Sequence, residues 1–180
     1  TFKSVIKRNI SYYNKYPEDA YAIQILAERI DGSKGLKLPS GGILTLQRFL
    51  TLGLHFGAHG GIDNVHDIVL RMSSDMKQFD CITRPTLSAI ENLVTLDETV
   101  LYAVLHEAIY CERQASQWAA KRVAHSLPEF DWINGSPPHA SRGHGKALYF
   151  SGEMIYPFAF ETYPELQRLR EVADILAEYE

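Results

Sequence analysis

A carboxylate inside an apolar stretch is the first candidate for chemistry in this sequence. Glu107 lies within YAVLHEAIYC, residues 102–111, where nearly every other side chain is apolar. A helix that is apolar on all sides is usually buried, so the stretch predicts a buried helix with Glu107 at its centre. The residues three and four positions away on such a helix include no base. Because an unpaired buried carboxylate is costly, Glu107 should meet a cation, take up a proton or face a wet cavity.

Glu153, in the stretch SGEMIYP, has a similar setting. Its local neighbours are apolar except for Ser151, and the nearest base in the segment is Lys146. Two carboxylates in aromatic-rich, base-poor surroundings could together hold a small cation such as a substrate amine. Aromatic side chains could supply an apolar and cation–π lining for it. The candidates for this lining are Tyr110, Tyr149, Phe150, Tyr156 and Phe158.

A structural role for the two glutamates is the alternative. Each could pair with an arginine from elsewhere in the chain, because structural ion pairs are the commoner fate of such residues. The candidate partners are Arg71, Arg84, Arg113 and Arg122. Cys111 would lie one helical turn after Glu107, on the same face, so modification of its thiol would block a pocket that Glu107 lines.

Histidines suggest two further kinds of site. A metal-dependent helical enzyme would use His55, His59, His66 and Asp63, and the spacing of the first two suits ligands on one helical face. The glycines between them predict a helix end instead, and the glutamate of a metalloprotease motif is missing. Ser141, between His139 and His144, could suggest a nucleophile, but no Gly-x-Ser-x-Gly elbow occurs in the chain. We therefore predict a surface loop over residues 131–147.

Composition excludes several classes of protein. The chain has 180 residues and a formal net charge of −4, with no basic run, so we expect no nucleic-acid partner. No apolar segment is long enough to cross a bilayer and no signal-peptide pattern occurs, so we expect no membrane partner. Cys81 and Cys111 make no disulfide framework, which favours reduced thiols and a cytoplasmic location. The chain begins with Thr1 and ends in a helical pattern, so we expect a piece of a longer protein.

Helical periodicity dominates the chain and predicts an all-α fold. Two short apolar pieces around PSGG predict a small β-hairpin near residues 36–45. Thr45 would cap the helix that follows it. The predicted helices cover residues 4–17, 17–30, 45–57, 61–79, 83–94, 102–111, 115–127 and 164–180.

Several blocks of the sequence resemble the helical cap region of prolyl aminopeptidases, also called proline iminopeptidases. The most specific blocks are LHEAIYC and GEMIYP. RPTLSAIE, LREVADILAEYE and RNISYYNKYPED also fit, so the resemblance runs across almost the whole chain. The match is to the longer branch of this family, within the α/β-hydrolase superfamily.

The resemblance implies that this chain is one part of a larger enzyme, in which the cap and the catalytic core have different roles. The family removes N-terminal proline from peptides with a Ser-His-Asp triad on an α/β core, and this chain matches only the cap. We therefore expect residues 1–180 to form one helical cap domain that lacks the catalytic core and is inactive alone. By motif, Glu107 and Glu153 would hold the free amine of the peptide, beside Tyr110 and Tyr156. No cofactor or metal is implied, and the partners would be the peptide and the core of the same protein.

A non-catalytic helical interaction module remains the rival interpretation. In that case the aromatic cluster would be a protein-docking face. An isolated cap would also expose apolar surface that normally covers the core, so the two interpretations overlap in behaviour. Whether that surface prefers an α/β-hydrolase core or another partner distinguishes them.

Overall fold

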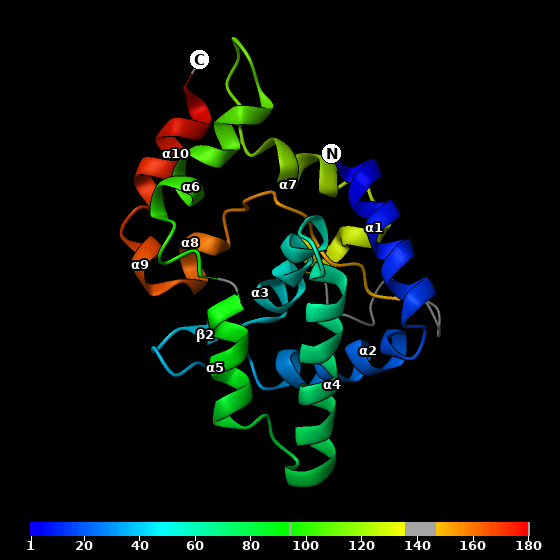
Figure 1. Cartoon of the computed structure of the whole chain (residues 1–180). Helices are drawn as coiled ribbons and strands as arrows, with labels where there is room; N and C mark the ends of the chain where they lie inside the picture. The colour runs from blue at the N-terminus through cyan, green and yellow to red at the C-terminus, as the bar shows by residue number, and fades with distance from the viewer. Residues whose placement is uncertain (94, 136–146, 180) are drawn as a thin grey trace.

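The computed structural model describes residues 1–93, 95–135 and 147–179, and these residues confirm the predicted all-α class (Figure 1). Helices account for most of the described chain, and the one sheet found there is a two-stranded hairpin. None of the described helices combines the length and apolar character needed to cross a membrane.

The first half of the chain follows the predicted helices closely. Its long helices are α1 (Phe2–Lys15), α2 (Asp19–Gly32), α4 (Gly61–Phe79) and α5 (Arg84–Leu93). Pro17 stands in the turn between α1 and α2, because proline lacks the N–H that would continue the first helix. In Figure 1, α2 lies beside α4, and the lower part of α4 projects below the rest of the molecule.

The hairpin near residues 36–45 is confirmed. Strands β1 (Leu36–Lys37) and β2 (Ile43–Leu44) pair antiparallel, with Leu36 opposite Leu44. Thr45 then caps helix α3 (Leu46–Leu50), as predicted: its side-chain oxygen accepts the Arg48 backbone N–H at 3.1 Å. The predicted single helix 45–57 is wrong in its second half, where the chain tightens into the 3-10 helix η1 (Thr51–Gly57). Gly53 and Gly57 have low helix propensity, which favours this irregular geometry.

The second half is broken into shorter pieces than predicted. The stretch 102–111 is not one α-helix but helix α6 (Val100–Leu105) followed by the 3-10 helix η2 (His106–Tyr110). The predicted helix 115–127 shrinks to α7 (Ala119–Ala124), because Gln117 and Trp118 have φ values of 47° and 56°, which no right-handed helix accepts.

The remaining elements lie towards the C-terminus. The 3-10 helix η3 (Pro128–Asn134) occupies the start of the predicted loop 131–147, so the loop prediction is wrong for those residues. Ser141, His139 and His144 lie outside the described residues. Helix 164–180 is divided into two, since the chain departs from helical geometry at Leu169. The final elements are α8 (Ala159–Thr162), α9 (Pro164–Gln167) and α10 (Arg170–Glu178).

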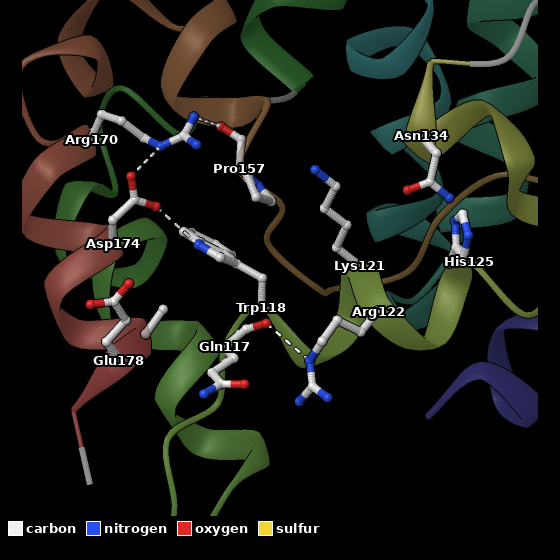
Figure 2. A pocket seen from close by; sticks show the side chains of 11 residues that line it. Gln117, Trp118, Lys121, Arg122, His125, Asn134, Pro157, Arg170, Asp174 and Glu178 are labelled. Atoms are coloured by element: carbon white, nitrogen blue, oxygen red, sulfur yellow. Dashed lines mark hydrogen bonds and ion pairs between the residues drawn. The ribbon is translucent and has the colours of Figure 1, made fainter.

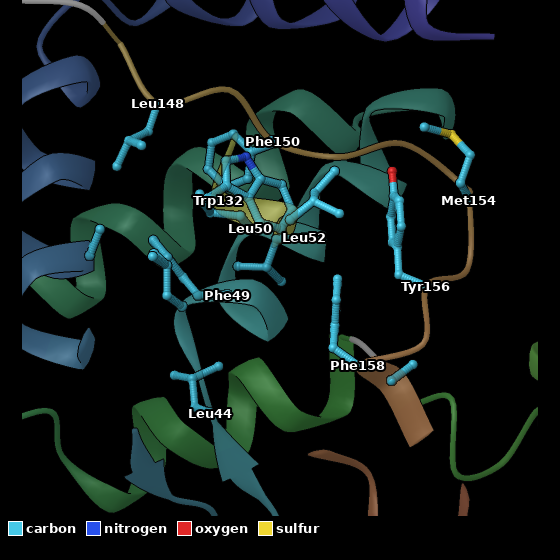
Figure 3. Close-up of a cluster of buried hydrophobic side chains, with 14 of the residues drawn as sticks. Leu44, Phe49, Leu50, Leu52, Trp132, Leu148, Phe150, Met154, Tyr156 and Phe158 are labelled. Atoms are coloured by element: carbon cyan, nitrogen blue, oxygen red, sulfur yellow. The ribbon is translucent and has the colours of Figure 1, made fainter. Parts of the chain in front are cut away.

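An irregular segment, residues 147–158, crosses the middle of the molecule and carries much of the core (Figure 3). Phe150 is fully buried against the rings of Phe49 and Phe56. The buried side chain of Asn9 fixes this segment to α1: its Nδ2 donates to the Phe150 carbonyl at 2.9 Å, and its Oδ1 accepts the Phe150 N–H at 2.7 Å. The segment therefore has a fixed register against α1, and Glu153 follows three residues later.

Candidate functional site

Glu107 is buried in the structure, as the sequence predicts. Its side chain is 3% exposed, and its Oε1 accepts the backbone N–H of Ala119 at 2.5 Å. Its Oε2 is buried and has no hydrogen-bond partner among the described residues. Burial raises the pKa of the Glu107 carboxyl above its ordinary value, although the Ala119 N–H, Ser116 and Arg122 act in the opposite direction. The Oε2 atom of Glu107 therefore lacks a hydrogen-bond donor among the described residues.

The predicted alternative of paired glutamates is not realised within residues 1–93, 95–135 and 147–179. Neither Glu107 nor Glu153 takes part in an ion pair there. Arg122 instead donates to two backbone carbonyls, those of Ser116 at 2.9 Å and Gln117 at 3.0 Å. Arg113 lies 3.9 Å from the exposed Glu112.

Glu153 differs from the prediction in one respect, because its side chain is exposed rather than buried. The next residues, Met154 to Phe158, turn into the core, and Glu153 is left at the surface just before them. The Tyr102 hydroxyl donates to the Glu153 backbone carbonyl at 3.0 Å, which ties the segment to α6. The carboxylate itself is therefore open to a ligand from solution.

Three rings form a row along α6 and η2 beside this contact: Tyr102, His106 and Tyr110. The Tyr102 and His106 rings lie 4.4 Å apart, and the His106 and Tyr110 rings 5.4 Å apart. His106 Nε2 lies 2.9 Å from the Tyr110 hydroxyl. Burial lowers the pKa of His106, and the charge of Glu153 opposes that shift. His106 was not among the residues predicted from the sequence, although its spacing of four residues from each tyrosine is the signal that could have identified it.

Both glutamates act on the same tyrosine hydroxyl. Burial raises the pKa of Tyr110, and the charges of Glu153 and Glu107 raise it further. Burial also raises the pKa of Tyr102, and the charge of Glu153 adds a smaller rise. Both carboxylates therefore influence the Tyr110 hydroxyl electrostatically.

Tyr156, the fourth predicted site residue, is part of the core. It is 1% exposed, and its ring stacks on Phe158 with centroids 5.3 Å apart (Figure 3). The Ser151 hydroxyl donates to the Tyr156 hydroxyl at 3.2 Å. Burial raises the pKa of Tyr156, the hydrogen bond with Ser151 opposes the rise, and the charges of Tyr110 and Glu107 add to it. Tyr156 is therefore a core residue whose hydroxyl is bonded to Ser151.

Cys111 does not lie on a helical face with Glu107, which corrects the prediction. Helix η2 ends at Tyr110, and Cys111 has an extended backbone with φ −131° and ψ 133°. Its thiol is free and half-buried. The correction follows from the early end of the α-helix at Leu105, which removes the helical register that the prediction assumed.

The four residues of the rival metal site do not form one ligand set in the described part of the chain. His55 Nε2 lies 2.7 Å from the Leu93 carbonyl, and Asp63 binds the Lys15 ammonium at 2.5 Å. His66 Nδ1 lies 2.9 Å from Asp19 Oδ2, whereas His59 is exposed. A different trio, Glu18, Asp19 and His66, brings its ligand atoms within 4.8 Å of one another. The Tyr12 hydroxyl already occupies that buried Asp19 oxygen.

A groove of about 1080 Å³ lies between α7 and α10 (Figure 2). On one wall, Asp174 accepts the Trp118 indole N–H at 3.0 Å and the Arg170 Nε–H at 2.8 Å. Trp118 immediately precedes Ala119, whose N–H holds Glu107, so the groove wall adjoins the backbone that positions this carboxylate. The charged lining side chains are Lys121, Arg122, Arg170, Asp174 and Glu178, and His125 also lines the groove.

Comparison with known proteins shows which class of protein this chain resembles. No family model matches the chain. The chain is similar to proline iminopeptidases, as its motifs predicted. It is 35% identical over 176 residues to the proline iminopeptidase aneH of Aspergillus aculeatus, covering 98% of this chain and 37% of that protein. It is 30% identical over 178 residues to the proline iminopeptidase of Aeromonas sobria, covering 99% of this chain and 38% of the relative. The chain thus spans well under half the length of either relative.

Proposed function

We propose that this chain is the substrate-recognition cap of a serine aminopeptidase that removes proline from the N-terminus of peptides. In this proposal Glu107 and Glu153 hold the free amine of the substrate. The observations that carry it are the buried Glu107 with its unpartnered Oε2 and the exposed Glu153, neither of which forms an ion pair among the described residues. Sequence similarity to proline iminopeptidases supports the substrate class.

The chemistry of the cluster suits an N-terminal proline. This residue presents a secondary ammonium group on an apolar ring, so it needs anions for the charge and an aromatic wall for the ring. Glu153 would meet the ammonium from the exposed side, and the unpartnered Oε2 of Glu107 would accept from the buried side. Tyr102, His106 and Tyr110 offer the wall beside them.

The same carboxylates would make the site selective for a free terminus. An internal or acylated proline nitrogen carries no charge and no proton to donate. Without the ammonium, the buried Glu107 keeps an unsatisfied oxygen, and a buried polar group left unpaired costs about 1–3 kcal/mol. Rejection of blocked peptides would therefore follow from the carboxylates themselves.

Bond cleavage itself is assigned to a part of the enzyme outside this chain. Acyl transfer needs a nucleophile, a base and an oxyanion hole, which we place on an α/β core. An apolar surface on α6, η2 and α10 supports docking of this core, because α10 packs against α6 and both expose apolar side chains. The exposed residues are Leu101, Leu105, Ile109, Val172, Ile175 and Tyr179. The free cysteines fit a reducing, cytoplasmic setting.

Turnover of matched substrates tests this function. The full-length protein should release proline from L-prolinamide and leave N-acetyl-L-prolinamide intact, because only the first presents an ammonium group. The 180-residue chain alone should cleave neither. Equal cleavage of the blocked and free substrates by the full-length protein, or turnover by the isolated chain, would sink the proposal.

A further inference from the structure

Glu153 also lines a small cavity on the side of the segment that faces α1. The cavity has a volume of about 170 Å³. One wall comes from the start of α1 and the residue before it, at helical spacing: Thr1, Ser4, Val5 and Arg8. The opposite walls come from η1 and from Ser151 to Glu153. Val5 and Phe56 are buried and supply apolar surface.

The walls of this cavity are fixed by close backbone packing. Gly152 lies against Val5, and a Cβ on the glycine would stand 2.6 Å from the Val5 Cγ2. The paired hydrogen bonds between Asn9 and the Phe150 backbone set the register of α1 against the segment. Arg8 precedes Asn9 directly, and Glu153 is three residues beyond Phe150, so the same clamp positions both charged residues.

Two residues of opposite charge, Arg8 and Glu153, therefore line one cavity and form no ion pair with each other. Arg8 makes no ion pair or hydrogen bond from its side chain within the described parts of the chain, and Glu153 makes no ion pair there. Both side chains are exposed, so a ligand can reach them. A guanidinium group matches a carboxylate through two parallel N–H donors, which makes Arg8 a suitable anchor for a free carboxylate.

We propose that Arg8 binds the C-terminal carboxylate of short peptide substrates. This inference rests on the proposed function, because it takes the substrate ammonium to lie at Glu153 and Glu107. The proline ring would occupy the aromatic side of Glu153, and the rest of the peptide would pass Glu153 into the cavity, ending at Arg8. The enzyme would thus recognise both charged ends of the substrate, as a zwitterion.

The size of the cavity favours short peptides. At ~30 Å³ for each molecule, 170 Å³ holds roughly five or six waters, which is the scale of one small residue with its carboxylate. A long peptide would have no carboxylate beside Arg8. Its remaining residues would have to extend out of the open side of the cavity. Prolyl dipeptides are therefore the substrates that satisfy both Glu153 and Arg8.

A pair of substrates that differ only at the C-terminus tests this inference. The full-length protein is assayed with the dipeptide Pro-Ala and with its amide, and kcat/KM is measured for each. The ratio of acid to amide should fall about tenfold or more in Arg8→Gln, because a charge-assisted pair is lost. In Lys7→Gln, which removes a neighbouring exposed charge outside the cavity, the ratio should match the wild type.

The outcomes separate this inference from the function on which it rests. If the wild type cleaves both substrates and Arg8→Gln leaves the ratio within twofold, the carboxylate role of Arg8 is wrong and the amine site stands. If the wild type releases proline from neither substrate, the proposed function fails and this inference fails with it. Unchanged thermal unfolding of Arg8→Gln shows that a changed ratio comes from binding rather than misfolding.

Discussion

At the residue scale, the buried carboxylate of Glu107 lowers folding stability, and the proposed function gives it a role in binding the substrate amine. A buried carboxylate with one unpartnered oxygen destabilises the fold, and the burial that raises its pKa is the physical expression of that cost. A group kept for folding alone would be neutral or paired. Strain of this kind is typical of a binding site that waits for its ligand.

The cost of Glu107 predicts a stability change on neutralisation. The ordinary pKa of the group is 4.5, and its folded-state pKa is raised. The stability that the protonated form contributes is therefore complete below about 4.5 and is lost as the pH rises through the folded-state pKa. Glu107→Gln abolishes this loss, so at pH 7 it should raise the free energy of unfolding by on the order of 1 kcal/mol, or the Tm by about 2–4 °C.

Thermal unfolding between pH 4 and pH 8 measures this effect. The difference in Tm between Glu107→Gln and the wild type should grow as the pH rises. Glu112→Gln is the matched control, because that side chain is 90% exposed and its removal should leave the Tm unchanged at every pH. A lower Tm for Glu107→Gln at pH 7 would show that the charge stabilises the fold, contrary to this account.

At the scale of elements, the irregular segment 147–158 leaves Glu153 at the surface beside α6. It is held by Asn9 of α1, by Tyr102 of α6 and by the close approach of η1. At Gly53 a Cβ would stand 2.1 Å from the Ser151 carbonyl oxygen, which is a backbone atom and cannot swing aside. Gly53 is therefore needed for the packing of this segment.

This packing predicts opposite outcomes for two glycines of the same 3-10 helix. Gly53→Ala should lose about 1–3 kcal/mol of folding free energy, because the new methyl overlaps the segment. Gly57→Ala, where a Cβ meets no atom within 4 Å, should leave stability unchanged or slightly increased. Urea denaturation of the two variants measures both. Equal stability of Gly53→Ala and the wild type would mean that the segment packs differently.

Sequence alone predicted the long helices well and the short ones poorly. Helix α4 coincides with the predicted 61–79, because its apolar stripe repeats at helical spacing over nineteen residues. The region 102–127 was predicted as longer helices than exist. One break comes from left-handed backbone at Gln117 and Trp118, which are not glycine, so nothing in the residue types announced it. The other is the change from α6 to η2 after Leu105.

At the scale of the whole molecule, the candidate site joins segments that are distant in the chain. Glu107 was predictable as a buried carboxylate from its apolar neighbours. The exposure of Glu153 was not, because it depends on where the irregular segment leaves the core. The cavity that contains Arg8 was equally hidden, since a clamp between Asn9 and Phe150, 141 positions apart, creates it.

The central claim is that the two glutamates hold the substrate amine, and kcat/KM for L-prolinamide tests it most directly. In the full-length protein, Glu153→Gln should lower kcat/KM by about 10²-fold, since a hydrogen bond to a charged group contributes roughly 1.5–3 kcal/mol. Glu107→Gln should lower it to a similar degree while the protein stays folded, and Glu112→Gln should leave it unchanged. A kcat/KM within twofold of the wild type for both glutamine variants would contradict the amine site.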